Sequence, residues 1–348
     1  MEGQSLTIRK PDDFHVHLRD GNVLKTVAPL SAAQFGRILV MPNLKPPVVT
    51  VEDAKQYRDR ILKAVPGVDL IMTLYLTDNT TPEMIRDAAN SGIVKACKLY
   101  PAGVTTNSAS GVTSLDKISK ALDAMEQLGI ILCVHGEVTP DVREDMFDRE
   151  REFVRSVLVR ITSTYPKLKV VVEHVSTKEA VEYVLSHPSD NISATVTPQH
   201  LCFDRSALFK NSKLHMDLFC LPILKTRDDR EAIRSAVKSG SRRFFAGTDS
   251  APHPQCDKIG GAAGVFSAAA AVELYAEAFD EMDAMEQLEP FLSENGARFY
   301  GLELNHGSLS LKKTPKEVPR RIAIENSEEY LTPMKAGELL SWSVVGTG

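Results

Sequence analysis

Eight short apolar runs alternate with stretches of helical periodicity along most of this 348-residue chain. The runs are rich in β-branched residues and lie at 13–18, 37–42, 69–76, 94–100, 130–135, 168–173, 192–197 and 242–247. Helical periodicity occurs at 51–65, 81–91, 115–128, 143–164, 176–186 and 228–238. Near-continuous apolar strands separated by helices are typical of a parallel sheet covered by helices. Eight such units over about 250 residues predict an α/β fold, a (β/α)8 TIM barrel.

An open doubly wound sheet would show the same alternation, so the positions of the polar residues decide between the two folds. No glycine-rich turn follows the first predicted strand, which disfavours a dinucleotide-binding sheet. Polar residues follow or end six of the strands, at His17, Asn43, Lys98, His135, His174 and Asp249. Residues at the carboxyl ends of barrel strands meet at the mouth, where barrel enzymes build their active sites. The pattern therefore favours the barrel.

The pattern changes after residue 250. A glycine-rich stretch at 260–264 leads into an alanine-rich helix that ends near Phe279, and a second helix is expected at 284–293. The tail that starts at Asn305 is polar, with an apolar patch around Trp342. We expect residues 1–304 to form the barrel and residues 305–348 to form a short C-terminal extension, a strap packed on it.

Charge and cysteine content exclude several function classes. The net charge of −5 comes from interleaved acids and bases, which disfavours a nucleic-acid-binding surface. The five cysteines are scattered and form no Cys-x-x-Cys pair, which fits a reducing compartment and no thiolate zinc site. Neither a secretory leader nor an apolar stretch of about 20 residues is present, so we expect no membrane insertion and a cytoplasmic protein. A cleaved organelle address remains an alternative.

His15 and His17 form a His-x-His pair on the first predicted strand. Residues i and i+2 of a strand point to the same side, so the two imidazoles would make half of a site for a divalent metal. The full set of strand-end candidates is His15, His17, Lys98, His135, His174 and Asp249. Four imidazoles and a carboxylate exceed the three protein ligands of a usual catalytic zinc, and they suffice for two metals.

Lys98 is unusual in this set because an ammonium group has no lone pair and is repelled by a divalent cation. Two explanations would make it a ligand: the amine is deprotonated, or CO₂ converts it to a carbamate, an anionic oxygen donor that can bridge two metals. The ordinary alternative is a lysine at a strand end whose ammonium reaches solvent.

Six sequence blocks closely resemble the dihydroorotases of the stand-alone, short-chain type within the amidohydrolase superfamily. The blocks are DFHVHLR (13–19), MPN (41–43), KLYPAG (98–103), VHGE (134–137), EH (173–174) and GTDSAPH (247–253). The resemblance extends from about residue 6 to residue 302, with the blocks in family order. It implies the reversible cyclisation of N-carbamoyl-L-aspartate to L-dihydroorotate in de novo pyrimidine biosynthesis.

The resemblance also implies a role for each candidate ligand. His15, His17 and Asp249 would hold one zinc ion, and His135 and His174 would hold a second. Lys98, as N6-carboxylysine, would bridge the two zinc ions together with a hydroxide. Asp249 would be the catalytic residue, a general base that takes a proton and then returns it as an acid. The family further suggests a homodimer.

The substrate carries a carboxylate, which requires a planar pair of donors. Arg19 can supply them, two residues beyond the His-x-His pair. The resemblance adds the following to the substrate site: Asn43 and His253 beside that carboxylate, main-chain contacts at Leu221 and Ala263, and Thr105 and Thr106 on a mobile lid. The stretch 254–260 is shorter and less basic than in the bacterial pattern. The role of His200, which also follows a strand, is left open.

Three alternatives remain. A dihydropyrimidinase or hydantoinase acts on rings without the carboxylate, so Arg19, Asn43 and His253 discriminate against it. A mononuclear deaminase would have no use for Lys98. A catalytically inactive barrel that serves as a scaffold would be expected to have lost metal ligands, and this chain retains all six.

Overall fold

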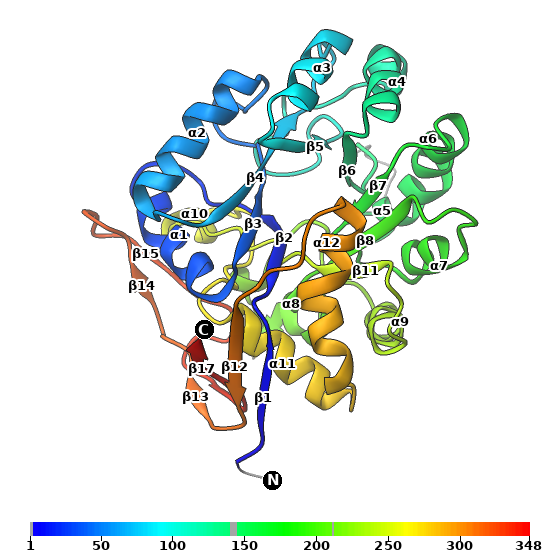
Figure 1. Ribbon diagram of the computed structural model, residues 1–348. Coiled ribbons are helices and arrows are strands. Elements are labelled where there is room, and N and C mark those ends of the chain that lie inside the picture. Colours follow the sequence, from blue (N-terminus) through cyan, green and yellow to red (C-terminus); the bar gives the residue numbers. More distant parts are fainter. Residues whose placement is uncertain (1–2, 140–144, 211) are drawn as a thin grey trace.

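A computed structural model describes residues 3–139, 145–210 and 212–348 and shows a barrel of eight parallel strands (Figure 1). The strands are β2 Asp12–Val16, β3 Arg37–Val40, β4 Asp69–Tyr75, β5 Val94–Leu99, β6 Ile131–His135, β7 Val170–Glu173, β8 Ile192–Val196 and β11 Phe244–Ala246. Each strand pairs with the next of these strands along the chain. All eight predicted strands and the (β/α)8 fold are confirmed.

The barrel closes between its first and last strands through the residues that follow β11. The amide of Asp249 donates to the carbonyl of His15 at 2.8 Å, and the amide of His17 donates to the carbonyl of Ser250 at 3.0 Å. Alternate residues of the strands point inward, and they fill the interior with Phe14, Leu39, Met41, Ile71, Ala96, Ile131, Cys133, Val171 and Phe245. The barrel is therefore a packed core, and only its mouth is left for a site.

Helices cover the outside of the barrel. They are α1 Gly21–Gln34, α2 Val51–Ala64, α3 Pro82–Asn90, α4 Ser119–Leu128, α5 Arg149–Phe153, α6 Val159–Thr164, α7 Lys178–Ser186, α8 Pro198–Cys202, α9 Arg227–Lys238, α10 Gln255–Ile259, α11 Ala271–Glu281 and α12 Asn295–Tyr300. Capping boxes at Thr50 and Thr226 begin α2 and α9. None of the helices within the described residues has the length and apolar character needed to span a bilayer.

Three of the predicted helices differ from the structure. The helix expected at 115–128 begins with a 3₁₀ turn at Leu115–Ile118, which α4 follows. The segment expected at 143–164 forms a helix from Arg149 to Thr164, with a π-turn at Val154–Leu158 in its middle, and residues 143–144 lie outside the described residues. The helix expected at 284–293 begins with a 3₁₀ turn at Met285–Gln287 and passes through a π-turn at Pro290–Glu294 into α12. The helical pattern was correct there, but the boundary was too early.

The C-terminal residues form short strands beside helices α1 and α11, on the outside of the barrel, coloured orange to red in Figure 1. Strands β12 Ser308–Lys312 and β17 Ser343–Thr347 make an antiparallel sheet with β1 Ser5–Arg9. Smaller pairs join β13 Lys316–Glu317 to β16 Leu339–Leu340, β14 Ile322–Ala323 to β15 Tyr330–Leu331, and β9 Phe209–Lys210 to β10 Lys213–Leu214. The division at residue 304 stays a prediction, and β1 pairs across it.

Trp342 anchors this C-terminal segment. Its side chain is completely buried, and the ammonium of Lys313 lies 5.8 Å from the centre of its ring. We expect Trp342→Ala to lower the free energy of unfolding by about 3–5 kcal/mol, because the change leaves a large cavity. Thermal unfolding of both proteins measures the effect. Leu339→Ala is the matched control, since Leu339 is 69% exposed. Equal melting temperatures for the Trp342→Ala variant and the parent protein would contradict this assignment.

Candidate metal and substrate site

The predicted site residues meet at the mouth of the barrel, around a pocket with about 340 Å³ of empty space, part of it open to solvent. The pocket is lined by these predicted residues: His15, His17, Arg19, Asn43, Thr105, Thr106, His135, His174, Leu221, Asp249 and Ala263. Tyr100, Ala251 and Gly264 also line it and were not predicted. Lys98 and His253 are not among the lining residues, although both contact this group, as described below.

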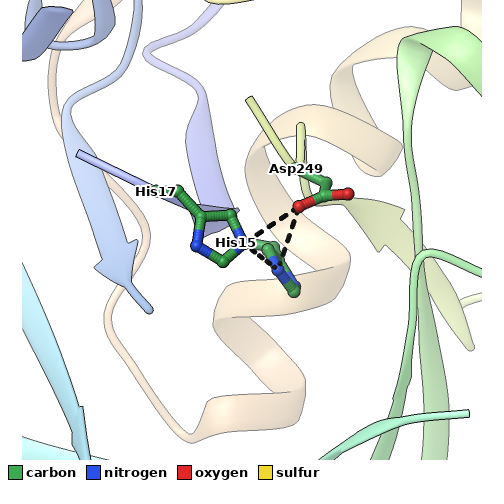
Figure 2. A group of neighbouring side chains, drawn as sticks. All are labelled: His15, His17 and Asp249. Atoms are coloured by element: carbon green, nitrogen blue, oxygen red, sulfur yellow. Dashed lines mark hydrogen bonds and ion pairs between the residues drawn. The ribbon is translucent and has the colours of Figure 1, made fainter. Parts of the chain in front are cut away.

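His15, His17 and Asp249 form the most compact part of the site (Figure 2). The Nε2 atoms of the two histidines are 3.3 Å apart, and Asp249 Oδ1 lies 3.4 Å from that of His15 and 3.1 Å from that of His17. All three residues are buried. Three ligand atoms at such distances, converging on one point, match the donor set of a zinc site with open positions.

Three of the histidines have one ring nitrogen held by a side-chain oxygen. His15 Nδ1 lies 2.7 Å from Glu173 Oε2, His17 Nδ1 lies 2.7 Å from Asn43 Oδ1, and His135 Nε2 lies 2.7 Å from Glu137 Oε2. Such partners fix the tautomer and direct the other nitrogen at a metal. Glu137 and Glu173 were not predicted as site residues. Glu137 shares a strand phase with His135, but no local signal connects Glu173 to His15.

Burial keeps most of these imidazoles neutral, which a metal ligand requires. It lowers the pKa of His17 to about 4, and it also lowers the pKa values of His135 and His174. Burial acts in the same direction on His15, but the Glu173 carboxylate raises the pKa of that residue above its usual value. Metal binding at His15 would therefore displace a proton.

Lys98 lies beneath the pocket and is completely buried, so the alternative of a solvent-reaching lysine is wrong. Its Nζ has no hydrogen-bond acceptor within the described part of the chain. His174 Nδ1 also has no hydrogen-bond partner there. The rings of His135 and His174 are 4.8 Å apart, and those of His15 and His174 are 5.0 Å apart. The Lys98 ammonium lies 5.2 Å from the centre of the Tyr100 ring but has no hydrogen-bond acceptor among the described residues. Such a buried amine near four imidazoles and a carboxylate fits a two-metal centre in which Lys98 is modified.

Three residues of the site have a strained backbone conformation. Arg19, His174 and Asp249 have φ angles of 59°, 42° and 44°, in the left-handed region that costs a non-glycine residue about 1 kcal/mol or more. The buried carboxylate of Asp13 stabilises this geometry: it accepts from the amide of His15 and from both the amide and the hydroxyl of Thr248. A Cβ on Gly247 would lie 2.9 Å from that of His15, so only glycine allows this close approach.

Arg19 places a guanidinium group at the pocket. Its Nε donates to the carbonyl of Pro252 at 3.0 Å, and its Nη2 lies 2.9 Å from His253 Nε2. Within the described ranges, no carboxylate forms an ion pair with it and no group accepts from its Nη1. Burial and the neighbouring guanidinium lower the pKa of His253 to about 3, so this ring is neutral. The pair is therefore suited to an anionic ligand, such as a carboxylate.

The polar loop at 105–111 lies against the pocket. The Thr106 hydroxyl donates to the carbonyl of Ala263 at 3.3 Å, and Asn43 Nδ2 donates to the carbonyl of Thr106 at 3.2 Å. Asn107 donates in turn to the carbonyl of Asn43 at 2.9 Å. The loop is thus connected to both sides of the pocket, and its movement as a lid stays a prediction.

His200, whose role was left open, is a buried structural residue. Its Nε2 donates to the carbonyl of Pro222 at 3.1 Å, and its Nδ1 accepts from the Thr197 hydroxyl at 2.8 Å. Both ring nitrogens are satisfied, and His200 does not line the pocket.

Known proteins with similar sequences and structures support the assignment that the geometry suggests. Residues 12–316 match the amidohydrolase family. Relatives named dihydroorotase include one from Laribacter hongkongensis, 51% identical over 98% of this chain and 99% of the relative, and one from Synechocystis, 48% identical over 98% and 100%.

Solved structures agree. A dihydroorotase of Saccharomyces cerevisiae in complex with 5-fluoroorotic acid superposes with a TM-score of 0.91 at 30% identity, covering 98% of both chains. A dihydroorotase of Campylobacter jejuni gives a TM-score of 0.89 at 36% identity, covering 99% of this chain and 98% of the other. An L-hydantoinase of Arthrobacter aurescens, at 15% identity and a TM-score of 0.78, shares the fold. The chain belongs to the amidohydrolase family and, within it, to the dihydroorotases.

Proposed function

We propose that this protein catalyses the reversible cyclisation of N-carbamoyl-L-aspartate to L-dihydroorotate. One observation carries the proposal: the same pocket combines a half suited to binding metal with a half suited to binding an anion. One half is the cluster of His15, His17 and Asp249 above the buried Lys98, and the other is the unpaired Arg19 beside a neutral His253. The first half suits attack on an amide carbonyl, and the second suits the ring carboxylate that distinguishes dihydroorotate from uncharged cyclic amides.

Two zinc ions, held by His15, His17 and Asp249 and by His135 and His174 with carboxylated Lys98 between them, would polarise the reacting carbonyl and activate water. The modification requires a neutral amine: its nitrogen bonds to the carbon of CO₂, and a proton is released. Burial lowers the pKa of Lys98, which favours that neutral form. Removal from solvent protects the product, and the carbamate supplies the anionic oxygen atoms that the amine lacks.

Asp249 would move the proton. In the cyclising direction its carboxylate accepts a proton from the ureido nitrogen as that nitrogen bonds to the side-chain carboxyl carbon of the substrate. It then gives this proton to the carboxyl oxygen whose C–O bond breaks, and that oxygen leaves as hydroxide and takes a second proton from solvent to become water. In hydrolysis it takes a proton from the attacking water and gives it to the ring nitrogen as the C–N bond breaks. Burial opposes ionisation, but hydrogen bonds with His15 and His17 hold the pKa of Asp249 well below its usual range. The group is therefore ionised and able to accept.

The substrate carboxylate would bind between Arg19, Asn43 and His253. Asn43 uses its Oδ1 for His17 and one N–H for Thr106, which leaves its second N–H for the ligand. The main chain at Leu221 and Ala263 would contact the ring, and Thr105 and Thr106 would close over it and exclude water.

The substrate and Arg19 are tested together. Zinc-loaded protein in bicarbonate buffer is expected to hydrolyse L-dihydroorotate and to leave dihydrouracil nearly untouched. Arg19→Met should lower kcat/KM for L-dihydroorotate by about a hundredfold, because the substrate carboxylate loses a positively charged, bidentate hydrogen-bond donor. Steady-state kinetics measure both effects, and Arg86→Met, an exposed change on α3, is the control.

Each contrary result has a distinct meaning. A preference for dihydrouracil would support the hydantoinase alternative and reject the carboxylate site. Inactivity on both substrates with two metals bound would support the scaffold alternative.

The homodimer and the cytoplasmic location remain predictions. Sedimentation equilibrium tests whether the protein is a homodimer.

A further inference from the structure

Lys258 is a second buried lysine near the pocket, and all of its donors are used. Only 4% of the residue is exposed, and its Nζ donates to the carbonyl oxygens of Phe219 at 3.0 Å, Ala262 at 2.9 Å and Gly264 at 2.8 Å. A lysine ammonium has three N–H groups, so each one has an acceptor. No carboxylate forms an ion pair with Lys258 within the described ranges.

The three carbonyls belong to the two segments that carry the expected main-chain contacts to the substrate ring. Phe219 lies two residues before Leu221, and Ala262 and Gly264 flank Ala263. Leu221, Ala263 and Gly264 line the pocket, whereas Lys258 does not. The amide of Gly264 also donates to the carbonyl of Phe219 at 2.9 Å, which joins the two segments directly. Lys258 therefore holds this wall of the pocket together from outside it.

Peptide geometry connects Lys258 to the direction of one N–H group. The C=O and N–H bonds of a trans peptide point in opposite directions. Because the carbonyl of Ala262 points at the buried ammonium, the N–H of Ala263 in the same peptide points away from it. The carbonyl of Ala263 meanwhile lies 3.0 Å from His253 Nε2 and accepts from the Thr106 hydroxyl. One residue thus contacts the anion site and the lid with its carbonyl, while Lys258 orients its amide.

The surroundings leave this segment little freedom. Gly264 has a φ of 153°, and a Cβ at this position would lie 2.2 Å from the carbonyl oxygen of Ala251. An ammonium is expensive to bury without a carboxylate, and an apolar side chain would fill the same space at lower cost. The three oriented carbonyls explain why a charge is placed here.

We propose that Lys258 is a positioning residue for the substrate ring, which acts by fixing the carbonyls of Phe219, Ala262 and Gly264 so that the main chain of Leu221 and Ala263 faces the ligand. This inference rests on the proposed function. It gives the unusual 254–260 segment a specific task, since α10 carries Lys258 into contact with both halves of the wall.

The test separates binding from fold. Lys258→Met keeps the length of the side chain and removes the donors. It should raise KM for L-dihydroorotate about tenfold while kcat stays within about threefold, since one wall of the pocket loses its orientation but the reacting groups do not. The matched control is Lys169→Met, because Lys169 also donates to a backbone carbonyl, that of Phe299 at 2.7 Å, away from the pocket. Lys169→Met should leave KM unchanged.

A second variant keeps the test decisive if Lys258→Met does not fold. Lys258→Gln retains two N–H donors and should raise KM about threefold. Wild-type KM in whichever of the two variants folds, or a loss of kcat with KM unchanged, would overturn the inference, because a merely structural role lowers the active fraction without changing substrate affinity. Wild-type protein that fails to hydrolyse L-dihydroorotate would instead overturn the proposed function, so the two failures are distinguishable.

Discussion

Lys98→Ala should lower kcat/KM for L-dihydroorotate hydrolysis by at least about a thousandfold and should also reduce the zinc that the protein retains. The reason is the position of this amine. It is completely buried among the histidines of the site, and no hydrogen-bond acceptor for it occurs in the described part of the chain. If its carbamate bridges the metals, the variant loses a ligand of both ions at once, and the remaining imidazoles are left without a shared anion.

Metal analysis after gel filtration and steady-state kinetics measure the two parts of this result. Lys95→Ala is the matched control, since Lys95 is on the same strand, β5, with its side chain exposed. A further experiment uses the parent protein after its metal has been removed. Zinc added with bicarbonate should restore more activity than zinc added in CO₂-free buffer. A variant that keeps its zinc and its activity would show that Lys98 is not the bridging group.

Asp249→Asn is the second change with a large expected effect. It should lower kcat by about 10²–10⁴-fold, because an amide of nearly the same shape cannot accept the proton that the carboxylate moves. The Oδ1 atom of Asp249 lies 3.1 Å from His17 Nε2, and Asp249 lines the pocket, so we expect it both to hold a metal and to contact the substrate. The zinc content of the variant separates these roles, because a variant that retains zinc but not turnover has lost proton transfer.

Asp257→Asn, an exposed change on α10, controls for the loss of a charge near the pocket. Turnover by Asp249→Asn within about tenfold of the parent protein would assign the proton transfer to another group, since general acid–base catalysis contributes more than that.

Local sequence determined the eight strands of the barrel and the candidate residues at its mouth. Buried parallel strands are apolar on both faces, so each of the eight strands was visible as a short apolar run. Most helices between the strands were identified by their period, but α1 between the first two strands was not. Polar residues at strand ends had to converge once the barrel was inferred, because the carboxyl ends of parallel strands meet at one mouth. For that reason His135, His174 and Asp249 could be grouped with the His-x-His pair.

The partners of these residues could not be read locally, because closure of the barrel brings together positions far apart in the chain. Glu173 holds His15 across 158 residues, and Asp13 holds Thr248 across 235 residues. Strand β1 was missed since its partner β12 lies near the other end of the chain. Strained φ angles at Arg19, His174 and Asp249 leave no signature in residue type.

The sequence by itself therefore determined which residues meet at the mouth of the barrel and are candidates for the chemistry, because side-chain type and strand phase are local properties. The tertiary structure decided the surroundings of those residues: which oxygen fixes each of three imidazoles, that Lys98 is completely buried, that no carboxylate among the described residues pairs with Arg19, and that Lys258 binds three carbonyls. These contacts join segments that are far apart in the sequence and become neighbours only when the barrel closes. They therefore arise from tertiary packing and leave no local pattern in the sequence.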